Sequence, residues 1–223
     1  MVEITEVKHT IQKNILSFLS HQKTARFRDM RPARTDTNLY SYHLTQLLKA
    51  GLVKKSDDGY TLGTAGLIYV DRVNAEKLFV RQQPKIVTMF VIQNGDGDIL
   101  LQRRNKQPFI DTWNLPNGKM HNDDGSVLAA AQREAQEKLS VTEQKMTHAG
   151  DCYIRVTQDG EQLTLTLAHV FLFNRDDIAT DENTQWLRPH KLAQYDLAPC
   201  VDQIMARAFF RDPFFFEEFE QSW

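Results

Sequence analysis

A turn signal between two apolar runs limits the folds open to the C-terminal part of the chain. The run 86–92, Ile-Val-Thr-Met-Phe-Val-Ile, is rich in β-branched and aromatic residues, and a second run extends from Ile99 to Arg104. Asn94-Gly-Asp-Gly97 stands between them, and Asn-Gly pairs favour tight hairpin turns. The sequence therefore predicts that a hairpin opens a sheet.

Further patterns place helices around this sheet. The alanine-rich segment from about Ser126 to Leu139 predicts a helix, and another is expected near 199–210. Strands are expected at 147–157 and 163–173, on either side of the turn 158–161. Mixed strands with helices on both sides indicate an α/β class and an α/β/α sandwich over residues 81–223.

The last fifteen residues form an apolar tail. Residues 209–223 contain six Phe and one Trp, and such a density of apolar side chains seldom stays exposed. We expect the tail to pack against the rest of the chain or against a second copy, so a homodimer is one expectation.

Residues 1–80 have a different pattern. Helices are expected at 5–20, at 37–50 before Gly51, and from Thr64 to about 74. Two short strands at 52–55 and 60–62 flank Ser56-Asp-Asp-Gly59, a hairpin signal. The second helix should bury Leu39, Tyr42 or His43, Leu44, Leu47 and Leu48.

This order of elements, with the string 40–66, YSYHLTQLLKAGLVKKSDDGYTLGTAG, resembles the winged helix-turn-helix of bacterial regulators. Residues 1–80 carry twelve Lys and Arg against eight Asp and Glu, a net charge of +4, which leaves −6 for residues 81–223. The resemblance implies binding of double-stranded DNA, with phosphates and base edges contacted by Arg26, Arg28, Asn38, Tyr40, Ser41, His43 and Lys55. A protein-interaction or dimerisation module remains an alternative.

A second resemblance lies in the C-terminal part. Trp113-x-Leu-Pro-Asn-Gly118, followed by Arg133-Glu134-x-x-Glu137, is similar to the Nudix hydrolases, whose box is GX5EX7REUXEEXGU. The similarity covers about residues 84–210. Four features depart from the box: Asp124 stands at the first Glu, one residue is inserted (most simply Gly125), Lys138 replaces the last carboxylate, and Ser140 replaces the closing Gly.

The resemblance implies hydrolysis of a diphosphate bond. Positions 134, 137 and 138 share one helical face, and Mg²⁺ or Mn²⁺ held there would activate water. The implied roles are catalytic for Arg133, Glu134 and Glu137, metal-binding for Gly118, Glu134 and Glu137, and substrate-binding for Lys119, Lys138 and Arg103. Lys138 leaves two alternatives open, a metal-free site or direct contact with phosphate.

Two functions follow from these patterns. The first is a Nudix-type hydrolase of a nucleoside diphosphate derivative, and the alternative is a DNA-binding regulator whose Nudix domain senses a nucleotide or an ADP-ribose-like ligand. Cys152 and Cys200 are too few for a disulfide framework, so buried thiols are expected. No apolar run approaches the roughly 20 residues of a membrane span, and a soluble cytoplasmic protein is expected.

Overall fold

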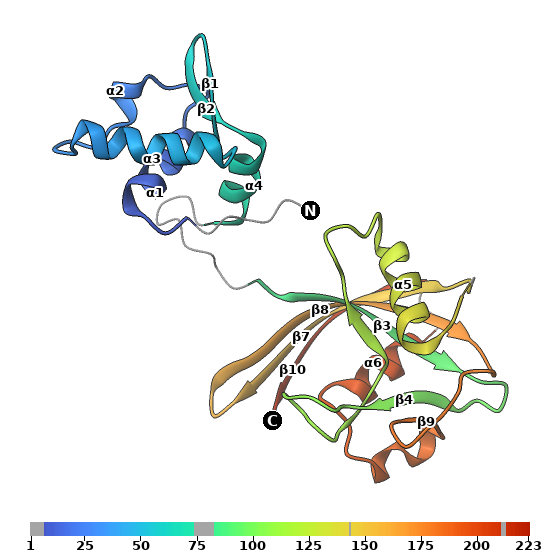
Figure 1. Ribbon diagram of the computed structural model, residues 1–223. Coiled ribbons are helices and arrows are strands. Elements are labelled where there is room, and N and C mark those ends of the chain that lie inside the picture. The colour runs from blue at the N-terminus through green and yellow to red at the C-terminus, as the bar shows by residue number, and fades with distance from the viewer. Residues whose placement is uncertain (1–6, 74–82, 143, 211–212) are drawn as a thin grey trace. The chain divides into compact units, whose positions relative to one another are not determined.

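The computed structural model describes residues 7–73, 83–142, 144–210 and 213–223 (Figure 1). The chain divides into two compact units, Met1–Gln83 and Pro84–Trp223. The boundary expected from the sequence lies near residue 80. Among the described residues, no helix is both long enough and apolar enough to cross a membrane.

The N-terminal unit is a winged helix-turn-helix, as the sequence predicts. Its elements in chain order are α1 (Thr10–Ser20), α2 (Phe27–Met30), α3 (Thr37–Lys49), β1 (Val53–Ser56), β2 (Gly59–Leu62) and α4 (Thr64–Arg72). β1 and β2 pair antiparallel as the hairpin. One core joins the helices and the hairpin, and it includes Ile15, Leu16, Leu19, Leu44 and Leu47.

Local signals set both ends of α3. The Asp36 side chain accepts hydrogen bonds from the backbone N–H groups of Asn38 and Leu39, both at 2.9 Å, which satisfies two donors at the helix start. Gly51 follows the helix with φ +68°, a left-handed conformation that glycine adopts without strain.

The buried face of α3 differs in part from the prediction, which is confirmed for His43, Leu44 and Leu47. Tyr40 and His43 are buried together with Leu44 and Leu47, whereas Leu39 and Tyr42 are exposed. Apolar or aromatic residues occur on both sides of this helix, so periodicity alone did not fix the angle at which it packs.

The C-terminal unit is built on one eight-stranded mixed sheet with the order β10-β7-β8-β3-β4-β5, to which β6 adds beside β3 and β9 beside β4. Its strands are β3 (Lys85–Gln93), β4 (Ile99–Arg103), β5 (Trp113–Asn114), β6 (Asn117–Lys119), β7 (Thr147–Gln158), β8 (Glu161–Asn174), β9 (Thr184–Leu187) and β10 (Phe215–Ser222). The hairpin, the strands of 147–174 and the helices predicted around them are present.

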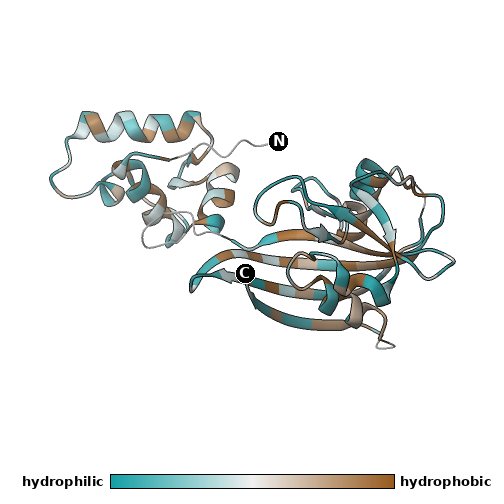
Figure 2. Cartoon of the chain, turned by 90° about the horizontal axis from the view of Figure 1, so that it is seen from below, coloured by the Kyte–Doolittle hydropathy of each residue, from teal (hydrophilic) through white to brown (hydrophobic). Residues whose placement is uncertain are grey.

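Helices cover both faces of this sheet (Figure 1). α5 (Val127–Leu139) packs on one face and α6 (Val201–Ala208) on the other, while a 3₁₀ helix, η1 (Pro189–Gln194), follows β9. Successive residues of β3 point to opposite faces, so Phe90 joins the α5 core and Val91 the α6 core. Figure 2 shows brown, hydrophobic stretches along the strands of this sheet.

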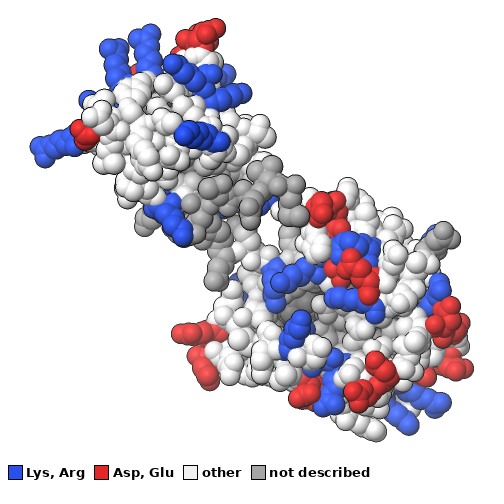
Figure 3. Space-filling view, in the orientation of Figure 1, with Lys and Arg blue, Asp and Glu red and all other residues white. Residues whose placement is uncertain are grey.

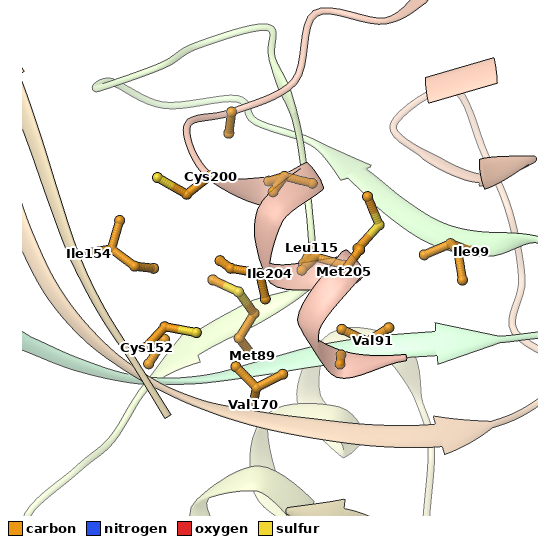
Figure 4. Close-up of a cluster of buried hydrophobic side chains, with 14 of the residues drawn as sticks. Met89, Val91, Ile99, Leu115, Cys152, Ile154, Val170, Cys200, Ile204 and Met205 are labelled. Atoms are coloured by element: carbon orange, nitrogen blue, oxygen red, sulfur yellow. The ribbon is translucent and has the colours of Figure 1, made fainter. Parts of the chain in front are cut away.

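Both cysteines belong to the core on the α6 side of the sheet, with Cys200 directly before the helix (Figure 4). Cys152 and Cys200 are free and buried. Burial raises the pKa of the Cys152 thiol to about 12 and that of Cys200 to about 11, because a thiolate is poorly solvated there. Their prediction as buried thiols is confirmed.

Part of the apolar tail forms β10, which pairs in parallel with β7. Phe215 is buried at the start of this strand. Its partner in register is Gly150, where an added Cβ would lie 2.4 Å from the Phe215 ring. The strand therefore packs within the same unit as the sheet, but Phe210, Phe214 and Phe216 are exposed, against the expectation that the tail would be covered.

Candidate functional site

Helix α5 carries the charged residues of the Nudix-like motif. The Ser126 side chain accepts a hydrogen bond from the Ala129 N–H at 3.1 Å and caps the helix start. Ser140, with φ 56°, ends the helix in the left-handed conformation that a glycine would adopt more easily. A serine thus occupies, in this chain, a left-handed position at which the motif has glycine.

Glu134 is buried on the inner face of α5. It is 4% exposed and lies against Gly118 of β6, where an added Cβ would come within 1.6 Å of Glu134 Oε2. Only a residue without a side chain leaves this space for the carboxylate. The structure therefore brings together Gly118 and Glu134, two of the three predicted metal-binding residues.

Arg133 holds the loop before α5 and the carboxylates of the helix together. Its Nε and Nη2 donate to the two oxygens of Asp124, each at 2.8 Å. Its Nη1 donates to Glu134 at 2.8 Å and to Glu137 at 3.4 Å. The Arg133 guanidinium, with a further hydrogen bond from the His121 N–H, holds the pKa of the Asp124 carboxyl well below its usual range.

Lys138 brings a second fixed cation to Glu134. Its Nζ lies 3.3 Å from Glu134 Oε2 and donates a hydrogen bond to the backbone carbonyl oxygen of Asn117. Glu134 Oε2 accepts no hydrogen bond within the described residues, so its contact with Lys138 is an ion pair. The ammonium connects α5 to the strand that carries Gly118.

These contacts leave no set of free carboxylates for a magnesium ion among the described residues of the motif. Glu134 faces Arg133 through one oxygen and Lys138 through the other. Glu137 contacts the same guanidinium, and its side chain is 56% exposed. Mg²⁺ requires oxygen ligands in a near-octahedral arrangement, and an ammonium 3.3 Å from the central carboxylate repels a dication. The Lys138 ammonium therefore disfavours Mg²⁺ or Mn²⁺ at Glu134.

A basic cavity of about 420 Å³ opens beside Lys138. Within the described parts of the chain, its lining has four cationic side chains and no carboxylate. The lining residues are Gln102, Arg103, Arg104, Asn105, Lys106, Asn114, Leu115, Asn117, Lys138, Asn183 and Thr184. Such a lining suits a ligand with several phosphate oxygens, because guanidinium and ammonium groups donate charge-assisted hydrogen bonds to them.

The cavity includes two of the three predicted substrate-binding residues, Arg103 and Lys138. Lys119 does not line it; its carbonyl oxygen accepts from Arg133 at 3.1 Å. Arg104 and Lys106 were missed, although the run Arg103-Arg-Asn-Lys106 after a predicted strand was a visible signal. The asparagines of β5 and β6 gave no comparable signal, because only the pairing of distant strands brings them here.

The predicted DNA-binding residues fall into two groups. Arg26, Arg28, Asn38 and Lys55 are exposed, and Ser41 is half-buried. In Figure 3, Lys and Arg side chains are spread over the visible face of the N-terminal unit, with few acidic side chains among them. This group is available to a nucleic acid.

Tyr40 and His43 were wrong as base-reading residues. Tyr40 is fully buried and contacts Phe27 edge-on at a centroid distance of 5.0 Å. His43 is buried and stacks on His9 at 3.8 Å. Burial raises the pKa of Tyr40 to about 12 and lowers that of His43, since each charged form would be desolvated. Tyr42 is the exposed aromatic side chain of this helix segment.

The fold and the charged helix define the class of the C-terminal unit, a Nudix domain with an altered charge pattern. The model of the NUDIX domain matches residues 82–208, and the chain belongs to this family. The MutT protein from Bacillus halodurans is similar at 17% identity and a TM-score of 0.50, over 62% of this chain and 90% of that one.

Two structures of NrtR from Shewanella oneidensis are also similar. Its NUDIX domain, complexed with ADP ribose, matches at 18% identity and a TM-score of 0.48, over 64% of this chain and 95% of that one. NrtR complexed with a 27mer DNA matches at 19% identity and a TM-score of 0.46, over 55% of this chain and 59% of that one. At 17% identity, the similarity to the MutT protein is one of fold.

Proposed function

We propose that this protein is a DNA-binding regulator whose Nudix domain binds a nucleoside diphosphate derivative without hydrolysing it. The observation that carries the proposal is the position of Lys138, whose ammonium lies 3.3 Å from the buried Glu134 carboxylate. The family's chemistry, as the resemblance implies it, needs a divalent cation held by Glu137, with Glu134 as a further ligand or as the base that orients water. A lysine fixed there favours binding over turnover.

The basic cavity supports a diphosphate ligand. Lys138 contacts Glu134 and also lines the cavity, where Arg103, Arg104 and Lys106 complete a cationic wall. Lys138 and Arg103 are already paired with Glu134 and Asp111, which leaves Arg104 and Lys106 to balance the charge of a diphosphate. The amide side chains of Asn114 and Asn117 offer neutral hydrogen bonds to a sugar or a base. In this arrangement Lys138 supplies the positive charge that a metal ion would otherwise bring to the phosphates.

The N-terminal unit supports the regulatory part of the proposal. A winged helix presents one helix to the major groove while flanking cations contact phosphates. α3 exposes Asn38, and Arg26, Arg28 and Lys55 are exposed on neighbouring segments. A positively charged unit joined to a ligand-binding unit is the composition that a ligand-responsive DNA-binding protein requires.

The experiment that tests the ligand part combines binding with turnover. A panel of nucleoside diphosphate derivatives that includes ADP-ribose is incubated with the protein and Mg²⁺ or Mn²⁺, with EDTA as the control. We expect no chelator-sensitive phosphate or nucleotide release, and at least one compound should raise the melting temperature. Chelator-sensitive release would contradict the proposal and establish the hydrolase instead.

A hydrolase of such compounds is the second candidate function. The observation that favours it is the anchoring of the helix carboxylates, because Arg133 is held by Asp124 through two hydrogen bonds of 2.8 Å and in turn holds Glu134. The turnover arm of the same panel decides between the two candidates. If turnover occurs, Glu137→Gln should abolish it.

DNA binding has its own test. Replacing Arg26 and Arg28 together by alanine removes two exposed cations, so the affinity for a random-sequence duplex at low salt should fall by about tenfold. The dependence of log Kd on log salt should become shallower by about two units, one for each phosphate that the variant no longer neutralises. Fluorescence anisotropy over a salt series measures both quantities.

The matched control for the Arg26 and Arg28 double variant removes two cations from the C-terminal unit. Lys145 and Lys191 are exposed in the Nudix domain, and Lys145→Ala with Lys191→Ala should leave DNA affinity within twofold of the parent. An equal fall in affinity in both double variants would show that net charge alone governs binding. A parent protein without affinity for DNA at low salt would remove the regulatory part of the proposal.

A further inference from the structure

Outside the Nudix helix, three metal-ligating side chains converge on one face of the sheet. His148 and Asp151 belong to β7, and His169 belongs to the neighbouring β8. One ligand atom from each lies within 4.8 Å of the other two. His148 Nε2 is 2.8 Å and His169 Nδ1 is 2.7 Å from the same oxygen, Asp151 Oδ1.

A break in the strand pairing creates this convergence. Residues three apart in a regular strand point to opposite faces of a sheet. The register of β7 against β8 shifts between His148 and Gly150, and a bulge of one residue re-aims the side chains on one side of it. His148 therefore shares a face with Asp151, which is paired directly with His169.

We infer that His148, Asp151 and His169 form a binding site for a divalent transition-metal ion such as Zn²⁺. Two imidazole nitrogens and one carboxylate oxygen are a common set of three protein ligands for zinc, which leaves further positions to water or another ligand. Imidazole ligands favour Zn²⁺, Ni²⁺ and Co²⁺ over Mg²⁺. This inference does not rest on the proposed function.

The geometry requires only a small adjustment to receive an ion. Two ligands at 2.0–2.1 Å from a tetrahedral ion lie roughly 3.3 Å apart, and the nitrogen-to-oxygen distances here are 2.8 and 2.7 Å. Each nitrogen-to-oxygen distance must lengthen by about 0.6 Å, and the two ring nitrogens, which lie within 4.8 Å of each other, must come to the same spacing. The three side chains are between 14% and 34% exposed, so an ion can reach them from solvent.

Aromatic side chains hold His148 in place. Its ring stacks on Phe171 at a centroid distance of 4.8 Å and meets Phe214 edge-on at 5.2 Å. An ordered apolar surround fixes the orientation of a ligating ring and limits access of water to the ion. Phe214 directly precedes β10, so an ion bound here would also stabilise the docking of the C-terminal strand.

The inferred site is separate from the Nudix helix. A row of paired positions crosses the sheet from Asp151 through His169 and Thr88 to Gly118. Three strand spacings separate Asp151 from Gly118, which corresponds to roughly 14 Å. Metal binding at His148 and binding at Glu134 can therefore be measured as independent events.

The test titrates the full chain, freed of metal by chelation and gel filtration, with Zn²⁺ by calorimetry and with Co²⁺ by visible absorption. We expect one ion per chain, a d–d absorption band from Co²⁺ bound to nitrogen and oxygen, and no competition from Mg²⁺ in large excess. Zn²⁺ should also raise the melting temperature. Absence of stoichiometric binding in the parent protein overturns the inference and leaves a hydrogen-bonded triad.

Two variants locate the ion. Asp151→Asn keeps the shape of the side chain but loses the charged ligand, and it should weaken Zn²⁺ binding at least tenfold and abolish the Co²⁺ band. His190 is an exposed histidine in η1 of the same unit, so His190→Ala should leave both signals unchanged. Equal affinity in Asp151→Asn and the parent would place the ion elsewhere and overturn the assignment.

Discussion

The Lys138→Glu variant should bind Mg²⁺ at least a hundredfold more tightly than the parent protein. The substitution removes the ammonium that lies 3.3 Å from Glu134 Oε2 and adds a carboxylate one helical turn away. Glutamates at positions 134, 137 and 138 would then share one face of α5. The Lys138 side chain is 40% exposed, so water screens the interaction, and a change of two charge units beside a dication at about 4 Å is then worth about 4 kcal/mol.

Isothermal titration with Mg²⁺ measures this gain without interference from the histidine cluster, since Mg²⁺ prefers oxygen ligands. Lys145→Glu is the matched control, because it makes the same charge change at an exposed position outside the site. If the parent already binds Mg²⁺ as tightly as Lys138→Glu, the ammonium does not block the ion. The regulator proposal would then lose its main support.

The same lysine shows what the sequence could and could not predict about the site. The motif placed Arg133, Glu134 and Glu137 on one helix, and in the structure Arg133 contacts both glutamates. The position of the Lys138 ammonium depends on the carbonyl oxygen of Asn117 on β6. Because β6 pairs with β3, distant contacts determine that position, and helical spacing alone left two alternatives for Lys138.

The fold was predictable where local signals were strong. Asn94 and Ser126 form hydrogen bonds with backbone groups a few residues away, and the hairpin of β3 and β4 and helix α5 occur where these residues predict them. The packing angle of α3 was not predictable, because Tyr40 and Tyr42 offer aromatic rings on different sides of one helix. The strand that pairs with the tail was not predictable either, because β10 pairs with β7, which lies more than 50 residues earlier in the chain.

The histidine cluster had no sequence signal for a related reason. His148 and Asp151 have a spacing that would separate them across a regular strand, and only the register shift in β7 brings them together. His169 comes from another strand, and no short motif links it to the other two.

The second large effect is expected from Gly118→Ala, which should destabilise the Nudix domain by about 3 kcal/mol. An added Cβ would lie 1.6 Å from Glu134 Oε2 and 1.9 Å from its Cδ. The carboxylate must then move away from Arg133 and Lys138, and disrupting a buried ion pair costs about 3–5 kcal/mol. For a domain of this size the melting temperature should fall by roughly 10 °C.

Gly125→Ala provides the matched control, because no atom lies within 4 Å of the Cβ that it would add. Its melting temperature should stay within about 2 °C of that of the parent, since surface substitutions away from special features change stability by about 0.5 kcal/mol or less. Both variants are compared by thermal unfolding monitored by circular dichroism. If Gly118→Ala melts at the parent temperature, β6 can move away from α5 at little cost. The close approach of Gly118 to Glu134 would then not be needed to hold the carboxylate beneath Lys138.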